Sequence, residues 1–61
     1  MMSKYTKVAA SKITALVRRP DFLRVTDIDH IFVWLEFDEQ YCSVSEFGAV
    51  QWYDKNEIGE G

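Results

Sequence analysis

Residues 30–46, HIFVWLEFDEQYCSVSE, contain the strongest strand pattern of the chain and the turn that follows it. Residues 30–37 are aromatic or β-branched almost throughout, which favours an extended strand. Polar residues 38–40 interrupt the pattern, and a second strand-like run follows at 41–46. This stretch predicts a β-hairpin, and its strands must pair antiparallel because a short turn joins them.

Two further strands are predicted on either side of this hairpin. Residues 22–26 form a short candidate strand followed by a turn at 27–30, and residues 49–53 form the last strand after Gly48 breaks the pattern. Residues 54–61 are polar, contain two glycines and are expected to form a flexible tail. Region 22–53 is therefore predicted to be an antiparallel β-meander of three or four strands.

The N-terminal segment 3–19 is predicted to be a helix. Its apolar side chains recur at spacings of three and four residues, as one face of a helix requires; they are Tyr5, Ala9, Ile13, Leu16 and Val17. Ser3 can cap the start, and Pro20 ends the helix. The β-branched and aromatic run at 5–8 leaves an alternative open, in which a short strand precedes a helix confined to residues 10–19.

The expected architecture is a single small α+β domain, 1–61, with one helix packed on one face of the sheet. Side chains alternate between the two faces of a strand. The purely apolar set should face the helix, and it comprises Ile31, Val33, Leu35, Phe37, Cys42, Val44, Val50 and Trp52. Phe32, Trp34 and Glu36 should then point to the opposite face.

Composition bounds the class of protein. A chain of 61 residues that is 48% hydrophobic makes one domain and is too apolar to be disordered. Cys42 is the only cysteine, so no internal disulfide can form, which fits the reducing cytoplasm. No apolar run approaches the roughly 20 residues of a membrane span. We expect a cytoplasmic protein that does not associate with membranes.

The charge of the chain is divided between its two parts. Residues 1–25 carry six cations and one acid, a net charge of +5, whereas residues 26–61 carry nine acids and one cation, a net charge of −8. Such asymmetry determines which partners each surface attracts.

Catalysis and cofactor binding have little support in the sequence. His30 lies beside Asp29, but no nucleophile is placed near it, and no glycine-rich phosphate loop is present. His30 and Cys42 are the only soft metal ligands, and Cys42 is expected to be a buried structural thiol. We therefore predict no catalytic residue, no cofactor and no metal.

The leading functional hypothesis is a small protein-binding module. Two large aromatic side chains on the sheet face opposite the helix indicate a contact surface, and the surrounding carboxylates favour a larger, basic protein as partner. The alternative is that the N-terminal segment, the tail or a second copy of the chain covers this face. The predicted partner-binding residues are Phe32, Trp34, Glu36, Asp38, Glu39, Glu46 and Tyr53. Such a surface could act as an inhibitor that blocks a nucleic-acid-binding groove. Small size and acidic pI are typical of phage and mobile-element inhibitors, although no motif here carries a family resemblance.

Two other functions remain open. A nucleic-acid-binding regulator would use the cations of the N-terminal helix, Lys4, Lys7, Lys12, Arg18 and Arg19. A homodimeric structural subunit would use the aromatic face as its own interface.

Overall fold

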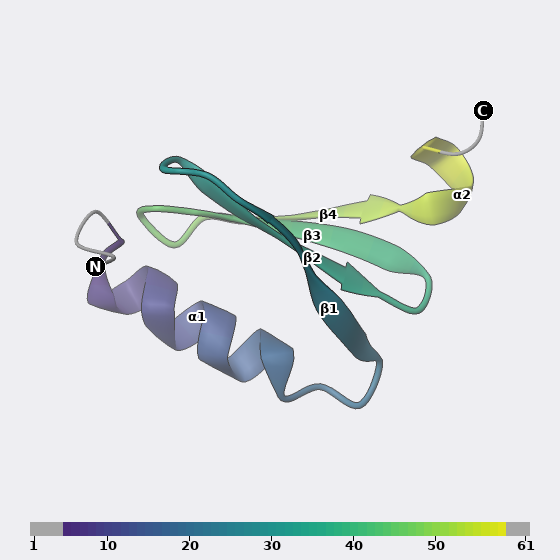
Figure 1. The fold of residues 1–61 in the computed structure, drawn as a ribbon, viewed down its shortest axis with the longest axis horizontal. Coiled ribbons are helices and arrows are strands. Elements are labelled where there is room, and N and C mark those ends of the chain that lie inside the picture. The colour runs from purple at the N-terminus through teal and green to yellow at the C-terminus, as the bar shows by residue number, and fades with distance from the viewer. Residues whose placement is uncertain (1–4, 59–61) are drawn as a thin grey trace.

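The computed structural model describes residues 5–58 and arranges four strands in one sheet with a helix against it (Figure 1). The strand order is β1-β2-β3-β4, and every neighbouring pair is antiparallel. This confirms the predicted α+β meander. The elements are α1 (Lys7–Val17), β1 (Phe22–Ile28), β2 (Phe32–Phe37), β3 (Gln40–Ser45), β4 (Val50–Asp54) and α2 (Lys55–Ile58).

Helix α1 is shorter than the predicted range 3–19. Its N-cap is Thr6, whose hydroxyl accepts a hydrogen bond from the Ala9 N–H at 3.1 Å, whereas the predicted cap Ser3 lies outside the described residues. Thr6 stays extended because its own N–H donates to the Glu46 carbonyl at 3.0 Å. At the other end, Pro20 disfavours helical geometry at Arg19, and α1 ends at Val17 with Arg18 as its C-cap.

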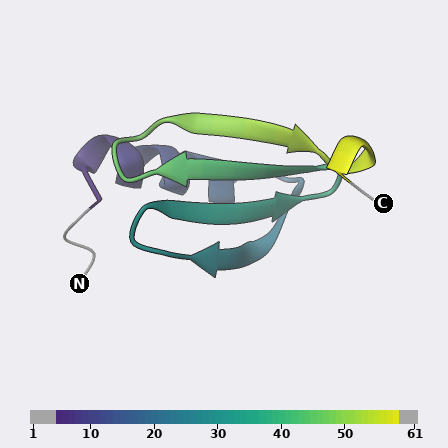
Figure 2. The ribbon, with the colours of Figure 1, turned by 90° about the horizontal axis from the view of Figure 1, so that it is seen from above.

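The hydrophobic core lies between α1 and the sheet, and Figure 2 shows α1 behind β3. Ala9 is fully buried, and the other members of the predicted helix stripe pack against the core with it. The core side chains of the sheet are Val33, Leu35, Phe37, Cys42 and Val44, as predicted. Ile31 was wrongly assigned to this set, because it lies in the loop before β2 and is half-exposed.

Arg19 closes one end of the core. Its guanidinium lies 5.3 Å from the centre of the Phe37 ring and 5.0 Å from that of Trp52, and its Nε donates to Asp21 Oδ1 at 3.1 Å. The Phe37 and Trp52 rings are themselves 5.2 Å apart. Trp52 is therefore on the helix side, as predicted, and Arg19 stacks on both rings.

Strand β1 is longer and less regular than predicted. Asp27 and Ile28, which were expected in a turn, continue the strand, and the turn is made by residues 29–31. Asp29 stabilises that turn, since its N–H donates to the Phe32 carbonyl and its carboxylate accepts from the Ile31 N–H. Pairing of β1 with β2 shifts register twice, between Phe22 and Arg24 and between Val25 and Asp27.

The predicted flexible tail 54–61 is also only partly correct. Asp54 belongs to β4, and a short helix, α2, follows directly. The Asp54 carboxylate accepts from the Asn56 N–H at 3.0 Å and holds this turn, while the Lys55 N–H donates to the Glu39 carbonyl at 3.1 Å. Residues 59–61 lie outside the described part of the chain.

Gly48 brings the β3–β4 turn against the start of α1. Its φ is +94°, in the region that side chains with a Cβ rarely adopt. A Cβ at this position would also lie 2.8 Å from Val8 Cγ1. Both the turn and the close helix contact therefore require glycine here.

We expect Gly48→Ala to lower the free energy of unfolding by about 1–3 kcal/mol. Val8→Ala alone should cost only about 0.5 kcal/mol, because Val8 is largely exposed. In the Val8→Ala background the penalty of Gly48→Ala should shrink, since the methyl that it meets has been removed while the unfavourable φ remains. Urea unfolding of the four proteins measures this coupling, and equal penalties in both backgrounds would contradict it.

Candidate functional site

The sheet face opposite α1 is covered by no helix in residues 5–58 (Figure 1). Alternation along the paired strands fixes which side chains it carries. We call this surface the outer face; its residues are Phe32, Trp34, Glu36, Tyr41, Ser43, Gln51 and Tyr53. The predicted anchors Phe32, Trp34 and Tyr53 therefore share one face.

Three aromatic rings form a continuous row across the outer face. The ring centres of Phe32 and Trp34 are 6.3 Å apart, and those of Trp34 and Tyr53 are 5.5 Å apart. Both pairs are tilted, within the distance range in which aromatic side chains attract one another. The hydroxyl of Tyr53 donates to Gln51 Oε1 at 2.7 Å. The row is a preorganised apolar surface with a polar end.

Ser43 on the central strand allows this row to form. It lies opposite Trp34 on one side and Gln51 on the other, and it is only 1% exposed. Because no described helix covers this face, the neighbouring side chains must bury it. A small residue at the centre lets a ring from β2 reach diagonally to a ring from β4.

Glu36 lies at the end of the row and is held by two cations. Its Oε1 accepts from Arg24 Nε at 2.9 Å, and its Oε2 accepts from Lys55 Nζ at 2.6 Å. Lys55 Nζ also lies 5.1 Å from the centre of the Tyr41 ring. Hydrogen bonds from Lys55 and then Arg24 hold the pKa of Glu36 below its ordinary value of 4.5. Its charge is neutralised within the molecule rather than offered to a partner.

The other predicted acids do not form one cluster. Asp38 and Glu39 are exposed at the β2–β3 hairpin, beside Lys55 and Asn56, and no ion pair of the described chain involves either. Glu46 lies at the opposite end of the sheet, where its carbonyl accepts from both the N–H and the hydroxyl of Thr6. Only Asp38 and Glu39 therefore adjoin the Tyr53 end of the aromatic row.

The cations that the sequence assigned to the N-terminal helix have different roles. Lys7, Lys12 and Arg18 are exposed, whereas Arg19 stacks on the core aromatics, and Lys4 lies outside the described residues. The free positive charge thus lies on the side of the molecule away from the outer face.

Cys42 is buried in the core beneath α1. Burial raises the pKa of its thiol to about 11, although the positive charge of Arg19 acts in the opposite direction. The thiol is therefore protonated at neutral pH and unsuited to nucleophilic attack. His30 lies in the exposed β1–β2 turn. Residues 5–58 contain no group of three histidine, cysteine or acidic side chains that could hold a metal ion.

Sequence reasoning missed two residues of this site, Arg24 and Lys55. Arg24 lies opposite Glu36 because of the first register shift in β1, which no local pattern indicates. Lys55 was assigned to a flexible tail, although it directly follows the last strand. The signal that could have indicated both residues is their charge, which is opposite to that of Glu36 on strand β2.

No protein-family model, curated protein or solved structure matches this chain. Neither α1 nor α2 has the length and apolarity that crossing a membrane requires.

The ion cluster at Glu36 predicts a specific pH dependence. Because the pKa of Glu36 is lower in the folded protein, its ion pairs stabilise the fold above pH 4.5, and this contribution is lost as the pH falls through the folded value. Urea midpoints measured from pH 7 to pH 3 should therefore decrease less for Glu36→Gln than for the wild type. The matched control is Asp38→Asn, an exposed carboxylate outside the ion cluster. If the urea midpoints of Glu36→Gln and of the wild type decrease in parallel as the pH falls, the ion cluster contributes nothing to the pH dependence of stability.

Proposed function

We propose that this protein is a binding module that docks on a basic surface of a larger protein through its outer face. The observation that carries this proposal is the aromatic row of Phe32, Trp34 and Tyr53, across which no helix of residues 5–58 packs. Phe32 is 37% exposed, and Trp34 and Tyr53 are partly exposed. A folded monomer gains nothing in solubility from such a row, and exposed apolar patches with a polar rim are typical of interaction sites. Rigid aromatic side chains are also the commonest anchors of protein interfaces.

Charge supports a basic partner. The unpaired carboxylates of Asp38 and Glu39 lie at the Tyr53 end of the row, within the part of the chain that carries a net charge of −8. Rim carboxylates of this kind accelerate association with a positive surface more than they raise affinity. A protein whose basic surface binds phosphates would be attracted in this way, and docking there would inhibit it.

The first test concerns the centre of the row. Trp34→Ala should retain the fold, because Trp34 lies outside the core, and should weaken partner binding by about 30-fold or more, as for an interface hot spot. The tagged wild type is used to capture proteins from the lysate of the native host, and binding to each purified candidate is measured by calorimetry. Circular dichroism checks folding.

The matched control is Phe47→Ala. Phe47 is 72% exposed in the β3–β4 turn, and its ring makes none of the aromatic contacts of the row. The Phe47→Ala variant should therefore bind the partner as tightly as the wild type does. A partner that binds Trp34→Ala and wild type equally would remove the outer face from the proposal.

A second test separates protein binding from nucleic-acid binding. Asp38→Lys with Glu39→Lys should slow association with a basic partner, whereas Lys7→Glu with Arg18→Glu should have little effect. Surface plasmon resonance at several salt concentrations measures both rates. If the wild type instead binds duplex or single-stranded nucleic acid tightly and salt-sensitively, and the helix variant abolishes this, the nucleic-acid hypothesis replaces ours.

A further inference from the structure

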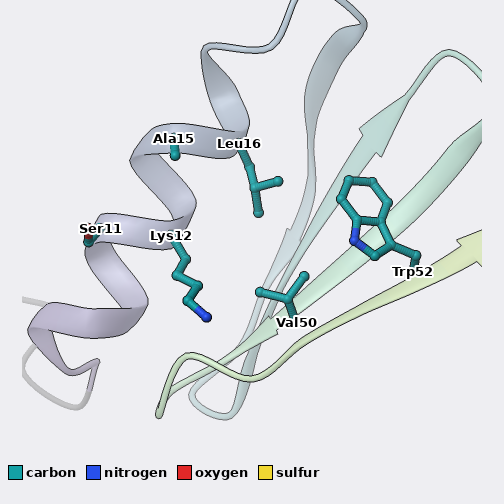
Figure 3. A pocket seen from close by; sticks show the side chains of 6 residues that line it. All are labelled: Ser11, Lys12, Ala15, Leu16, Val50 and Trp52. Carbon is teal, nitrogen blue, oxygen red and sulfur yellow. The ribbon is translucent and has the colours of Figure 1, made fainter.

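A groove runs between α1 and β4 on the side opposite the outer face (Figure 3). It has a volume of about 350 Å³, and its walls are Ser11, Lys12, Ala15 and Leu16 from the helix and Val50 and Trp52 from the strand. Its lining side chains carry three polar groups, the hydroxyl of Ser11, the ammonium group of Lys12 and the indole N–H of Trp52. Trp52, although packed on Phe37, remains 37% exposed here.

Helix α1 and strand β4 run side by side in the same direction. Gly48, just before β4, contacts Val8 near the start of the helix, and Arg19, just after the helix, stacks on Trp52. Lys12 therefore lies toward the Val50 end of the groove and Leu16 toward the Trp52 end, as Figure 3 shows.

Strand β4 lies at one edge of the sheet, and within residues 5–58 no strand pairs with its outer side. Ser45 N–H donates to the Ala49 carbonyl, and Lys55 N–H donates to the Glu39 carbonyl. Hydrogen-bonded pairs alternate along an antiparallel ladder, so residues 51 and 53 also face β3. Val50, Trp52 and Asp54 consequently direct their N–H and C=O groups outward, with their side chains on the groove side.

The two edges of the sheet differ. The two register shifts of β1 interrupt its ladder, and bulges of this kind protect an edge from pairing with another chain. Strand β4 pairs with β3 without a shift and contains neither proline nor lysine. Figure 2 shows β1 and β4 at opposite sides of the sheet. Only the β4 edge is suited to strand addition, and head-to-tail pairing of β4 with β1 is disfavoured.

We propose that the β4 edge binds the β4 edge of a second copy of this chain, which forms a twofold-symmetric dimer with one eight-stranded sheet. Antiparallel pairing centred on Trp52 matches the outward groups of both strands. It places Asp54 of each copy opposite Val50 of the other, next to the Lys12 end of the groove. The two tryptophans fill the open grooves. Each Asp54 carboxylate pairs with Lys12 of the other copy through the oxygen that does not accept from the Asn56 N–H.

Charge complementarity favours this occupant. The helical wall of the groove carries one cation, Lys12, and α1 contains no acid. The sequence Trp52-Tyr53-Asp54 provides an apolar side chain and a carboxylate two positions apart on one face of a strand. Antiparallel pairing centred on Trp52 places the Trp52 and Asp54 side chains of each copy at the groove of the other copy. This dimer goes beyond the proposed function, since it leaves both outer faces uncovered and places them side by side on one surface.

Analytical ultracentrifugation of the wild type from about 10 μM to 1 mM tests the dimer, a range suited to so small an interface. We expect reversible dimers. Lys12→Glu and Asp54→Lys each create two like-charge contacts and should weaken dimerisation about tenfold. The double variant restores opposite charges, so its dimer dissociation constant should return to within about threefold of that of the wild type. Such reciprocity requires direct contact between the two positions.

Two further measurements locate the interface. Exchange of the Val50 and Trp52 amide hydrogens should slow with rising protein concentration, whereas that of Gln51 should not change. Trp34→Ala should dimerise like the wild type but bind the partner of the outer face more weakly. The dimer and the proposed function can therefore fail independently of each other. The dimer is refuted if the mass stays at 7.1 kDa throughout. It is also refuted if Trp34→Ala abolishes association or if the double variant is not restored.

Discussion

A single helix cannot cover a four-stranded sheet, and the surface of this protein follows from that constraint. An α-helix is about 10 Å wide with its side chains, and strands lie about 4.8 Å apart, so α1 covers roughly two of the four. It packs on β3, where Cys42 and Val44 are buried. Val25 and Ile28 on β1 and Trp52 on β4 remain partly exposed on the same side. Within residues 5–58 no helix packs across the opposite face, where only the Lys55 side chain of α2 reaches Glu36 and the Tyr41 ring.

The charged residues divide into those that maintain the fold and those that remain free. Arg19 closes the core, and Glu36 joins β1 to the residue after β4 through Arg24 and Lys55. These groups stabilise the monomer and are already partnered. The free carboxylates at the hairpin and the free cations on α1 lie on different parts of the surface. The acidic and basic parts of the sequence therefore also form separate surfaces in the folded protein. Fewer charged side chains are free to contact a partner than the composition suggests.

The sequence was sufficient for the fold class, since alternation along β2 assigns Val33 and Leu35 to one face and Trp34 to the other. Local patterns could not locate the irregularities of β1, because a bulge is determined by pairing with a distant strand. The start of α1 depends on a bond from Thr6 to Glu46, which no nearby residue reveals. Alternation along the strands was enough to place the three aromatic anchors on one face. It could not show that Glu36 is neutralised or that Glu46 lies at the other end of the sheet, because both depend on contacts with distant residues.

The contact between Gly48 and Val8 has a consequence for the order of folding. It joins residues 40 positions apart, as does the bond between Thr6 and Glu46. The β-hairpins close over short loops, whereas docking of α1 needs residues as far as Gly48. Distant contacts form late because loop closure costs entropy. During synthesis, α1 is therefore made first but reaches its place last, and its apolar stripe stays exposed until the β3–β4 turn has been translated.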